Sequence, residues 1–108
     1  MATTYKVLGQ ISPSATTNTD LYTVPGATSA VCSTLAICNR GPSTTIRVAV
    51  RPAGAAISNQ HYIVYDVGLN QYDTTFLTLG VTLAATDVVT VYAGTSAVSF
   101  SIFGSEIA

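Results

Sequence analysis

The sequence predicts an all-β protein, an antiparallel β-sandwich of jelly-roll or immunoglobulin-like type with about eight strands, in a single domain of residues 1–108. Short runs rich in Val, Ile, Leu, Thr and Tyr alternate with Gly, Pro, Asn and Ser along the chain, which is the pattern of short strands joined by turns. In several runs, apolar residues occupy every second position, so that one face of each strand can be buried. No window keeps the spacing of an amphipathic helix over several turns.

The first four strands are predicted by runs that end at turn residues. Pro25-Gly26 ends the second run and Arg40-Gly41-Pro42-Ser43 ends the third, and both are turn compositions. The fourth run alternates strictly, with Ile46, Val48 and Val50 on one face and Arg47, Ala49 and Arg51 on the other. The four predicted strands are Thr4–Ile11, Thr19–Val24, Ala30–Asn39 and Thr45–Arg51.

The last four strands follow a segment, Ala53–Gln60, that is expected to be a loop or a single helical turn because Pro52 precedes it. Leu77, Leu79, Val81 and Leu83 alternate with Phe76, Thr78, Gly80 and Thr82, and Val98, Phe100 and Ile102 alternate with Ser99, Ser101 and Phe103. Asp73 and Asp87 directly precede two of these strands, where an Asp side chain usually caps a turn. The predicted strands are His61–Val67, Thr74–Leu83, Val88–Ala93 and Val98–Gly104.

The two cysteines, Cys32 and Cys38, lie in one predicted strand an even number of residues apart. Strict alternation places both on the same face about 20 Å apart, from a rise of ~3.3 Å per residue. Because a disulfide requires Cα atoms within about 7 Å, we expect two free thiols that behave as small buried apolar groups.

Catalysis is not expected. His61 is the single histidine of the chain, and alternation over His61–Asp66 places His61 and Tyr65 on one face and Tyr62 and Asp66 on the other. Asp66 therefore does not orient His61, and the other carboxylates are scattered singly, so neither a catalytic triad nor a metal or Ca²⁺ site is predicted. No cofactor is expected.

The scarcity of charge indicates that the protein assembles with other subunits. Charged residues make up 8% of the chain and hydrophobic residues 48%, whereas ordinary soluble domains carry roughly 25% charged residues. Four scattered Lys and Arg residues are too few for nucleic-acid binding. No run is long enough to span a membrane, and Met1–Lys6 lacks the features of a secretory signal, so synthesis in a cytosol is expected.

The candidate interface residues are those whose chemistry suits protein contacts. Arg47 and Arg51 share one face of a strand about 13 Å apart, from the same rise per residue, and Arg and Tyr are enriched at interfaces. His61, Tyr62 and Tyr65 lie together at the start of the next predicted strand. Salt bridging within the chain is the alternative role for the arginines, and packing at the rim of the fold is the alternative for the tyrosines.

Five strings resemble a group of small β-rich virion structural proteins of tailed bacteriophages, particularly phages of cyanobacteria and other aquatic bacteria. The strings are Leu21–Pro25, Ala36–Asn39, Arg47–Gly54, His61–Asp66 and Phe100–Ile107. This resemblance covers nearly the whole chain and brings no catalytic motif with it.

The resemblance implies a non-enzymatic virion protein made in the host cytoplasm. We expect a capsid decoration (cement) protein that binds and stabilises the assembled capsid as a homo-oligomer, with a trimer favoured. The alternative is a neck, tail or fibre component, including a host-glycan adhesion module whose sugar contacts come from Tyr62, Tyr65 and Tyr72.

Overall fold

A computed structural model describes residues 2–108, so the predicted domain is described from Ala2 onward. The predicted all-β class is confirmed, and all eight predicted strands are present. Six of them agree with prediction within one residue at each end, whereas β5 and β8 continue to Leu69 and Ile107. The segment after β4 is a loop containing two short 3-10 turns, η1 (Pro52–Gly54) and η2 (Asn59–His61). The strands are β1 (Thr3–Ile11), β2 (Thr19–Thr23), β3 (Ser29–Asn39), β4 (Thr44–Arg51), β5 (Tyr62–Leu69), β6 (Thr74–Leu83), β7 (Val88–Ala93) and β8 (Val98–Ile107).

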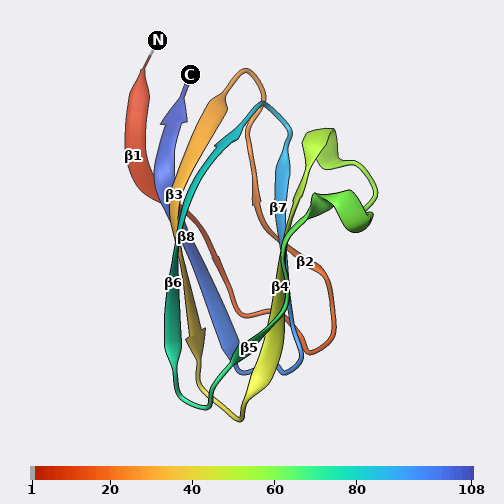
Figure 1. Cartoon of the computed structure of the whole chain (residues 1–108). Helices are drawn as coiled ribbons and strands as arrows, with labels where there is room; N and C mark the ends of the chain where they lie inside the picture. The colour runs from red at the N-terminus through yellow and green to blue at the C-terminus, as the bar shows by residue number, and fades with distance from the viewer. Residues whose placement is uncertain (1) are drawn as a thin grey trace.

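The strands form two four-stranded antiparallel sheets that pack face to face (Figure 1). The first sheet has the order β1-β8-β3-β6 and the second the order β2-β7-β4-β5. Four of the strand pairs are nested as in one long hairpin: β1–β8, β2–β7, β3–β6 and β4–β5. Two further pairs, β3–β8 and β4–β7, connect these pairs into the two sheets. A long hairpin rolled up in this way is a jelly roll, which decides between the two predicted sandwich types.

The core lies between the sheets, where the apolar residues of the alternating runs meet. Leu35 and Ile37 of β3 and Phe100 and Ile102 of β8 are fully buried, and Val91 of β7 faces them from the second sheet. The predicted alternation is confirmed along β6 and over Val98–Phe103 of β8, where more buried and more exposed residues alternate one by one. Burial of these side chains is the main favourable contribution to folding.

A β-bulge in β3 overturns the prediction that the two cysteines share a face. The register of β3 against both β6 and β8 shifts between Cys32 and Thr34, and an extra residue in a strand reverses the alternation beyond it. Cys32 is fully buried in the core, and burial raises the pKa of its thiol to about 11. Cys38 points outward and is partly exposed, and both thiols are free, as predicted.

Buried and capping polar groups fix the turns. The Asn39 side chain is 2% exposed; its amide donates to the carbonyl oxygens of Pro42 and Asn70, joining the turn after β3 to the turn after β5. Asp87 accepts backbone N–H bonds through both carboxylate oxygens, one from the turn before β7 and one from Ala53 of η1. Asp73 accepts a bond from the N–H of Thr74. The predicted capping roles of Asp73 and Asp87 are therefore confirmed.

One ionic network links the two sheets. The Tyr22 hydroxyl of β2 donates to Oε2 of Glu106 in β8 at 2.5 Å, and Lys6 Nζ of β1 lies 2.9 Å from Oε1 of the same carboxylate. The hydrogen bond from Tyr22, followed by that from Lys6, lowers the pKa of Glu106. Burial, followed by the bond to Glu106, raises the pKa of Tyr22.

We predict that Glu106→Gln lowers stability at neutral pH and weakens the acid sensitivity of the fold. A carboxyl whose pKa is lower in the folded protein stabilises it above the unfolded pKa, about 4.3 for Glu, and this stabilisation is lost as the pH falls through the folded value. At pH 7 we expect the variant to be less stable by about 1 kcal/mol. Urea denaturation at several pH values measures this difference, which should narrow in acid; a difference that stays constant with pH contradicts the role given to Glu106.

Candidate functional site

The two outer faces of the sandwich differ in chemistry, and the predicted interface residues gather on the second sheet. Arg47 lies in the middle of β4, with its guanidinium 4.4 Å from the ring centre of Tyr65 in β5 and 4.3 Å from that of Tyr92 in β7. Its Nε donates to Oδ1 of Asp66 at 2.6 Å, and this hydrogen bond raises the pKa of Arg47. We call Arg47, Tyr62, Tyr65, Asp66 and Tyr92 the arginine–tyrosine cluster.

A second β-bulge assembles this cluster. Ile46 pairs with Val67, whereas Val48 pairs with Val64, so two residues of β5 lie opposite Arg47. Asp66 has a φ of 52°, in the left-handed region that Asp tolerates better than most residues. Both Tyr65 and Asp66 therefore contact Arg47, and the predicted placement of Tyr65 and Asp66 on opposite faces is wrong because strict alternation ends at the bulge.

A further register shift in β5, between the partners of Val48 and Ala49, brings Tyr62 to the same face as Tyr65, whereas alternation had placed them on opposite faces. Their ring centres are 4.9 Å apart with an angle of 79° between the ring planes, which is a favourable edge-to-face arrangement. Together with Asn59 of η2, the two rings line an open groove of about 440 Å³. We call Asn59, Tyr62 and Tyr65 the tyrosine groove.

Arg51 and His61, the other two predicted interface residues, hold the loop between β4 and β5. Arg51 pairs with Asp20 at 2.8 Å, donates to the Thr90 hydroxyl, and donates to the carbonyl oxygens of Gly54 and Ala55. His61 accepts a hydrogen bond from the Ser58 N–H through Nδ1. These contacts keep the loop against the outer face of the second sheet. Arg51 and His61 therefore have a structural role within the chain.

Tyr72, the third tyrosine of the predicted glycan contacts, is far from the other two. It lies 74% exposed in the turn between β5 and β6, beyond the opposite end of β5 from Tyr62. The structure therefore brings Tyr62 and Tyr65 together and leaves Tyr72 separate.

Within residues 2–108, the strands of the first sheet place no charged side chain on its outer face, and one charged group, the Arg40 guanidinium, reaches the end of the face, where it donates to the Ser99 hydroxyl. The charged residues of these four strands are Lys6 and Glu106. Glu106 accepts a hydrogen bond from Tyr22 of the second sheet, and Lys6 pairs with Glu106. We call this surface the uncharged face. Strand pairing places the following side chains on it: Tyr5, Val7, Val31, Ala36, Cys38, Phe76 and Phe103, with hydroxyl-bearing Thr34, Thr74, Thr78, Thr82, Ser99, Ser101 and Ser105.

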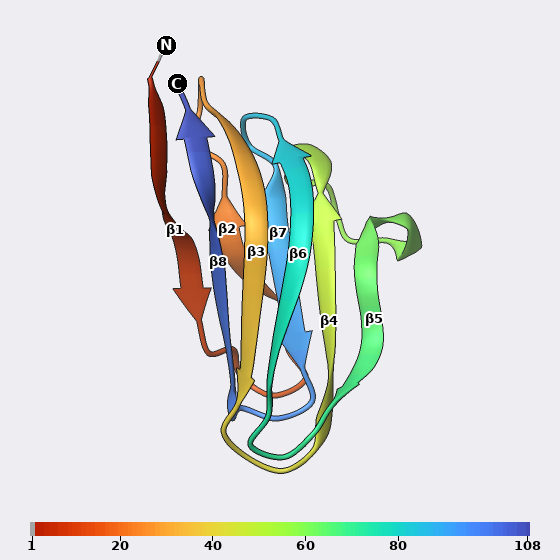
Figure 2. The ribbon, with the colours of Figure 1, turned by 60° about the vertical axis from the view of Figure 1, so that its left-hand side comes forward.

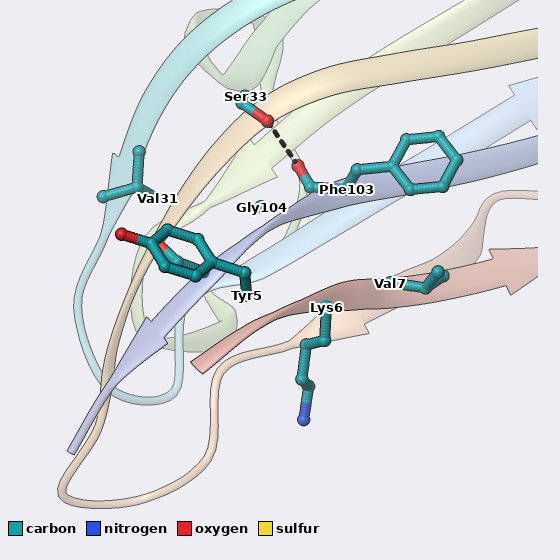
Figure 3. A pocket seen from close by; sticks show the side chains of 8 residues that line it. Tyr5, Lys6, Val7, Val31, Ser33, Phe103 and Gly104 are labelled. Atoms are coloured by element: carbon teal, nitrogen blue, oxygen red, sulfur yellow. Dashed lines mark hydrogen bonds between the residues drawn. The ribbon is translucent and has the colours of Figure 1, made fainter. Parts of the chain in front are cut away.

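The uncharged face is hollowed beside β1. An open groove of about 630 Å³ lies there, and Tyr5, Val7, Val31 and Phe103 supply its apolar lining (Figure 3). Lys6 contributes to the lining but points away from these side chains (Figure 3). Tyr5 is 83% exposed and Phe76, further across the sheet, is 69% exposed, so large rings stand in solvent on this face.

Sequence reasoning did not select the uncharged face or Tyr92. The sequence does contain a signal for the uncharged face, because alternation places Phe76 and Phe103 on the hydroxyl-bearing side of their strands. No local signal connects Tyr92 to Arg47, since the pairing of β7 with β4 joins distant parts of the chain.

The part of the chain that the structure describes holds no group of three or more His, Cys, Asp or Glu side chains placed to bind a metal. No helix within residues 2–108 has the length and apolar character needed to cross a membrane.

Comparison with models of protein families, with curated proteins and with solved structures found no match to this chain.

We predict that Arg47→Lys loosens the arginine–tyrosine cluster. A lysine ammonium neither pairs with a carboxylate through two nitrogens nor lies flat between two rings. The midpoint of urea denaturation should fall, and the near-ultraviolet circular dichroism of the tyrosines should weaken. Arg40→Lys is the matched control, because the Arg40 guanidinium contacts the hydroxyls of Ser99 and Ser12; equal changes in the two variants contradict the prediction.

Proposed function

We propose that this chain is a non-enzymatic structural component of a tailed-phage virion, acting as a capsid decoration protein that assembles as a homo-oligomer, with a trimer favoured. In this proposal, the uncharged face packs against a neighbouring copy. The observation that carries the proposal is the chemistry of that face, which exposes large rings and no charge across four strands.

Burying the uncharged face is favourable for physical reasons. Tyr5, Val7 and Phe76 are each about half exposed or more, so their burial removes substantial apolar area from water. Desolvation costs little, because no strand residue on this face within residues 2–108 is charged and Arg40, at its end, already donates to the hydroxyls of Ser99 and Ser12. Contiguous apolar patches are unusual on monomers and commonly mark contacts with other molecules.

The choice of a virion rests on the fold and the resemblance together. Jelly rolls occur in viral capsid proteins, but also in lectins and other proteins, so the fold alone does not assign a function. The strings that resemble tailed-phage virion proteins include Arg47–Gly54 and Phe100–Ile107. A protein that binds only the assembled shell stabilises that shell by mass action.

We predict that Val7→Lys dissociates the oligomer. A lysine in the groove of the uncharged face places a charge where the neighbouring copy packs, and an unpaired buried charge is costly. Val67→Lys on β5 is the matched control, because Val7 is 47% exposed and Val67 is 50% exposed. Light scattering after size-exclusion chromatography should give about three times the 11.1 kDa chain mass for the wild type and the control, and one chain mass for Val7→Lys.

A wild-type protein that remains a monomer at high concentration contradicts the oligomer. An oligomer that survives Val7→Lys but is lost in Val67→Lys assigns the contact to the second sheet instead.

A second prediction concerns the location of the protein in the virion. Cryo-electron microscopy of virions from a phage that encodes this chain should show density on the outer capsid surface, lost when the gene is deleted. Capsids without the protein should also break at lower temperature or weaker osmotic shock. Density confined to the neck, tail or fibres, with a bare capsid, contradicts the decoration role and supports the alternative location.

A further inference from the structure

We propose that the tyrosine groove is a carbohydrate-binding site for neutral pyranose sugars. This inference goes beyond the structural role above and does not depend on it, because the groove belongs to the other sheet. The loop that supplies Asn59 lies on the side of the second sheet away from the first, where it is light green in Figures 1 and 2.

The shape and chemistry of the groove match a pyranose ring. The rings of Tyr62 and Tyr65 meet at 79° and so form two sides of a corner, and the open groove of about 440 Å³ has room for a sugar unit. A pyranose has flat C–H surfaces that stack on an aromatic ring and a rim of hydroxyls. The Asn59 amide offers both donors and an acceptor to that rim, and the Tyr65 hydroxyl belongs to a side chain that is 56% exposed.

The groove is ordered before any ligand arrives. Tyr65 is held by the Arg47 guanidinium at 4.4 Å and by the edge-to-face contact with Tyr62. Asn59 lies in η2, whose turn is closed by the bond from the Ser58 N–H to His61. Rings that are fixed in advance lose little conformational entropy on binding, which matters for a sugar because each contact contributes little.

The charges around the groove favour a neutral sugar over an acidic one. No charged side chain lines the groove within the described residues. Arg47, which lies 4.4 Å from the ring centre of Tyr65, already pairs with Asp66 through Nε and Nη2, so its charge is balanced. An anionic sugar therefore meets no free cation, whereas a neutral sugar needs none.

The groove also stays accessible in the proposed oligomer. The uncharged face belongs to the first sheet and the groove to the outer side of the second, so packing of copies through the former leaves the latter outside. Several grooves on one particle would raise the avidity for a sugar-coated surface well above the affinity of a single groove. This gain alone depends on the proposed assembly.

The test is a titration of the isotope-labelled protein, followed by amide chemical shifts in nuclear magnetic resonance. The probes are methyl α-glucopyranoside, methyl α-mannopyranoside, methyl β-galactopyranoside and N-acetylglucosamine, with glucuronic acid as the anionic arm. At least one neutral sugar should shift the Asn59 side-chain amide and the backbone amides of Tyr62 and Tyr65. Absence of shifts with every neutral sugar, or stronger binding of glucuronic acid, overturns the proposal.

Three variants separate stacking from other effects. Tyr65→Leu keeps apolar bulk but removes the ring, and should weaken binding about tenfold or more, whereas Tyr65→Phe keeps the ring and should bind within a few-fold of the wild type. Tyr72→Leu is the control, an exposed tyrosine outside the groove, and should bind normally. Equal binding by Tyr65→Leu and the wild type overturns the proposal. Because these titrations work on a monomer, they remain informative if the oligomer prediction fails.

Discussion

The rest of this structure depends on the packing of two four-stranded sheets around one core. A strand has two faces, so each side chain either enters the space between the sheets or points away from it. The core takes the fully buried residues such as Leu35, Val48 and Phe100. The remaining strand side chains lie on the two outer faces, which differ in chemistry. The strands of the first sheet place aromatic rings and hydroxyl groups on its outer face, whereas the outer face of the second sheet holds both strand arginines.

Register shifts in β3 and β5 change which face a residue occupies. The bulge in β3 sends Cys32 into the core and Cys38 outward. The bulge in β5 directs Tyr65 and Asp66 toward the same arginine. Without this second bulge, Arg47 would have either a ring or a carboxylate from β5, but not both. The ordered position of Tyr65 therefore depends on this bulge in an edge strand, and the corner that Tyr62 completes depends also on the register shift between the partners of Val48 and Ala49.

The strands were predictable from the sequence because alternation and turn residues are local signals. Asp73 and Asp87 were predictable caps for the same reason: each acts on its own turn, although Asp87 also reaches Ala53 far along the chain. The strand order was not predictable, because the pairing of β1 with β8 or of β4 with β7 leaves no mark in either strand. The faces of Tyr65 and Cys38 were predicted wrongly because a bulge adds one residue without altering the composition of the strand.

The few charged side chains of this protein serve the fold itself. Lys6 pairs with Glu106, Arg47 with Asp66, and Arg51 with Asp20. Arg40 is bound to two serine hydroxyls, and the two remaining carboxylates cap turns. Each of the nine Lys, Arg, Asp and Glu residues thus has a partner within the chain, and none is left to dominate an interaction with another molecule. Recognition by either outer face must then come from shape, aromatic surface and hydroxyl groups, which is the chemistry that the uncharged face and the tyrosine groove provide.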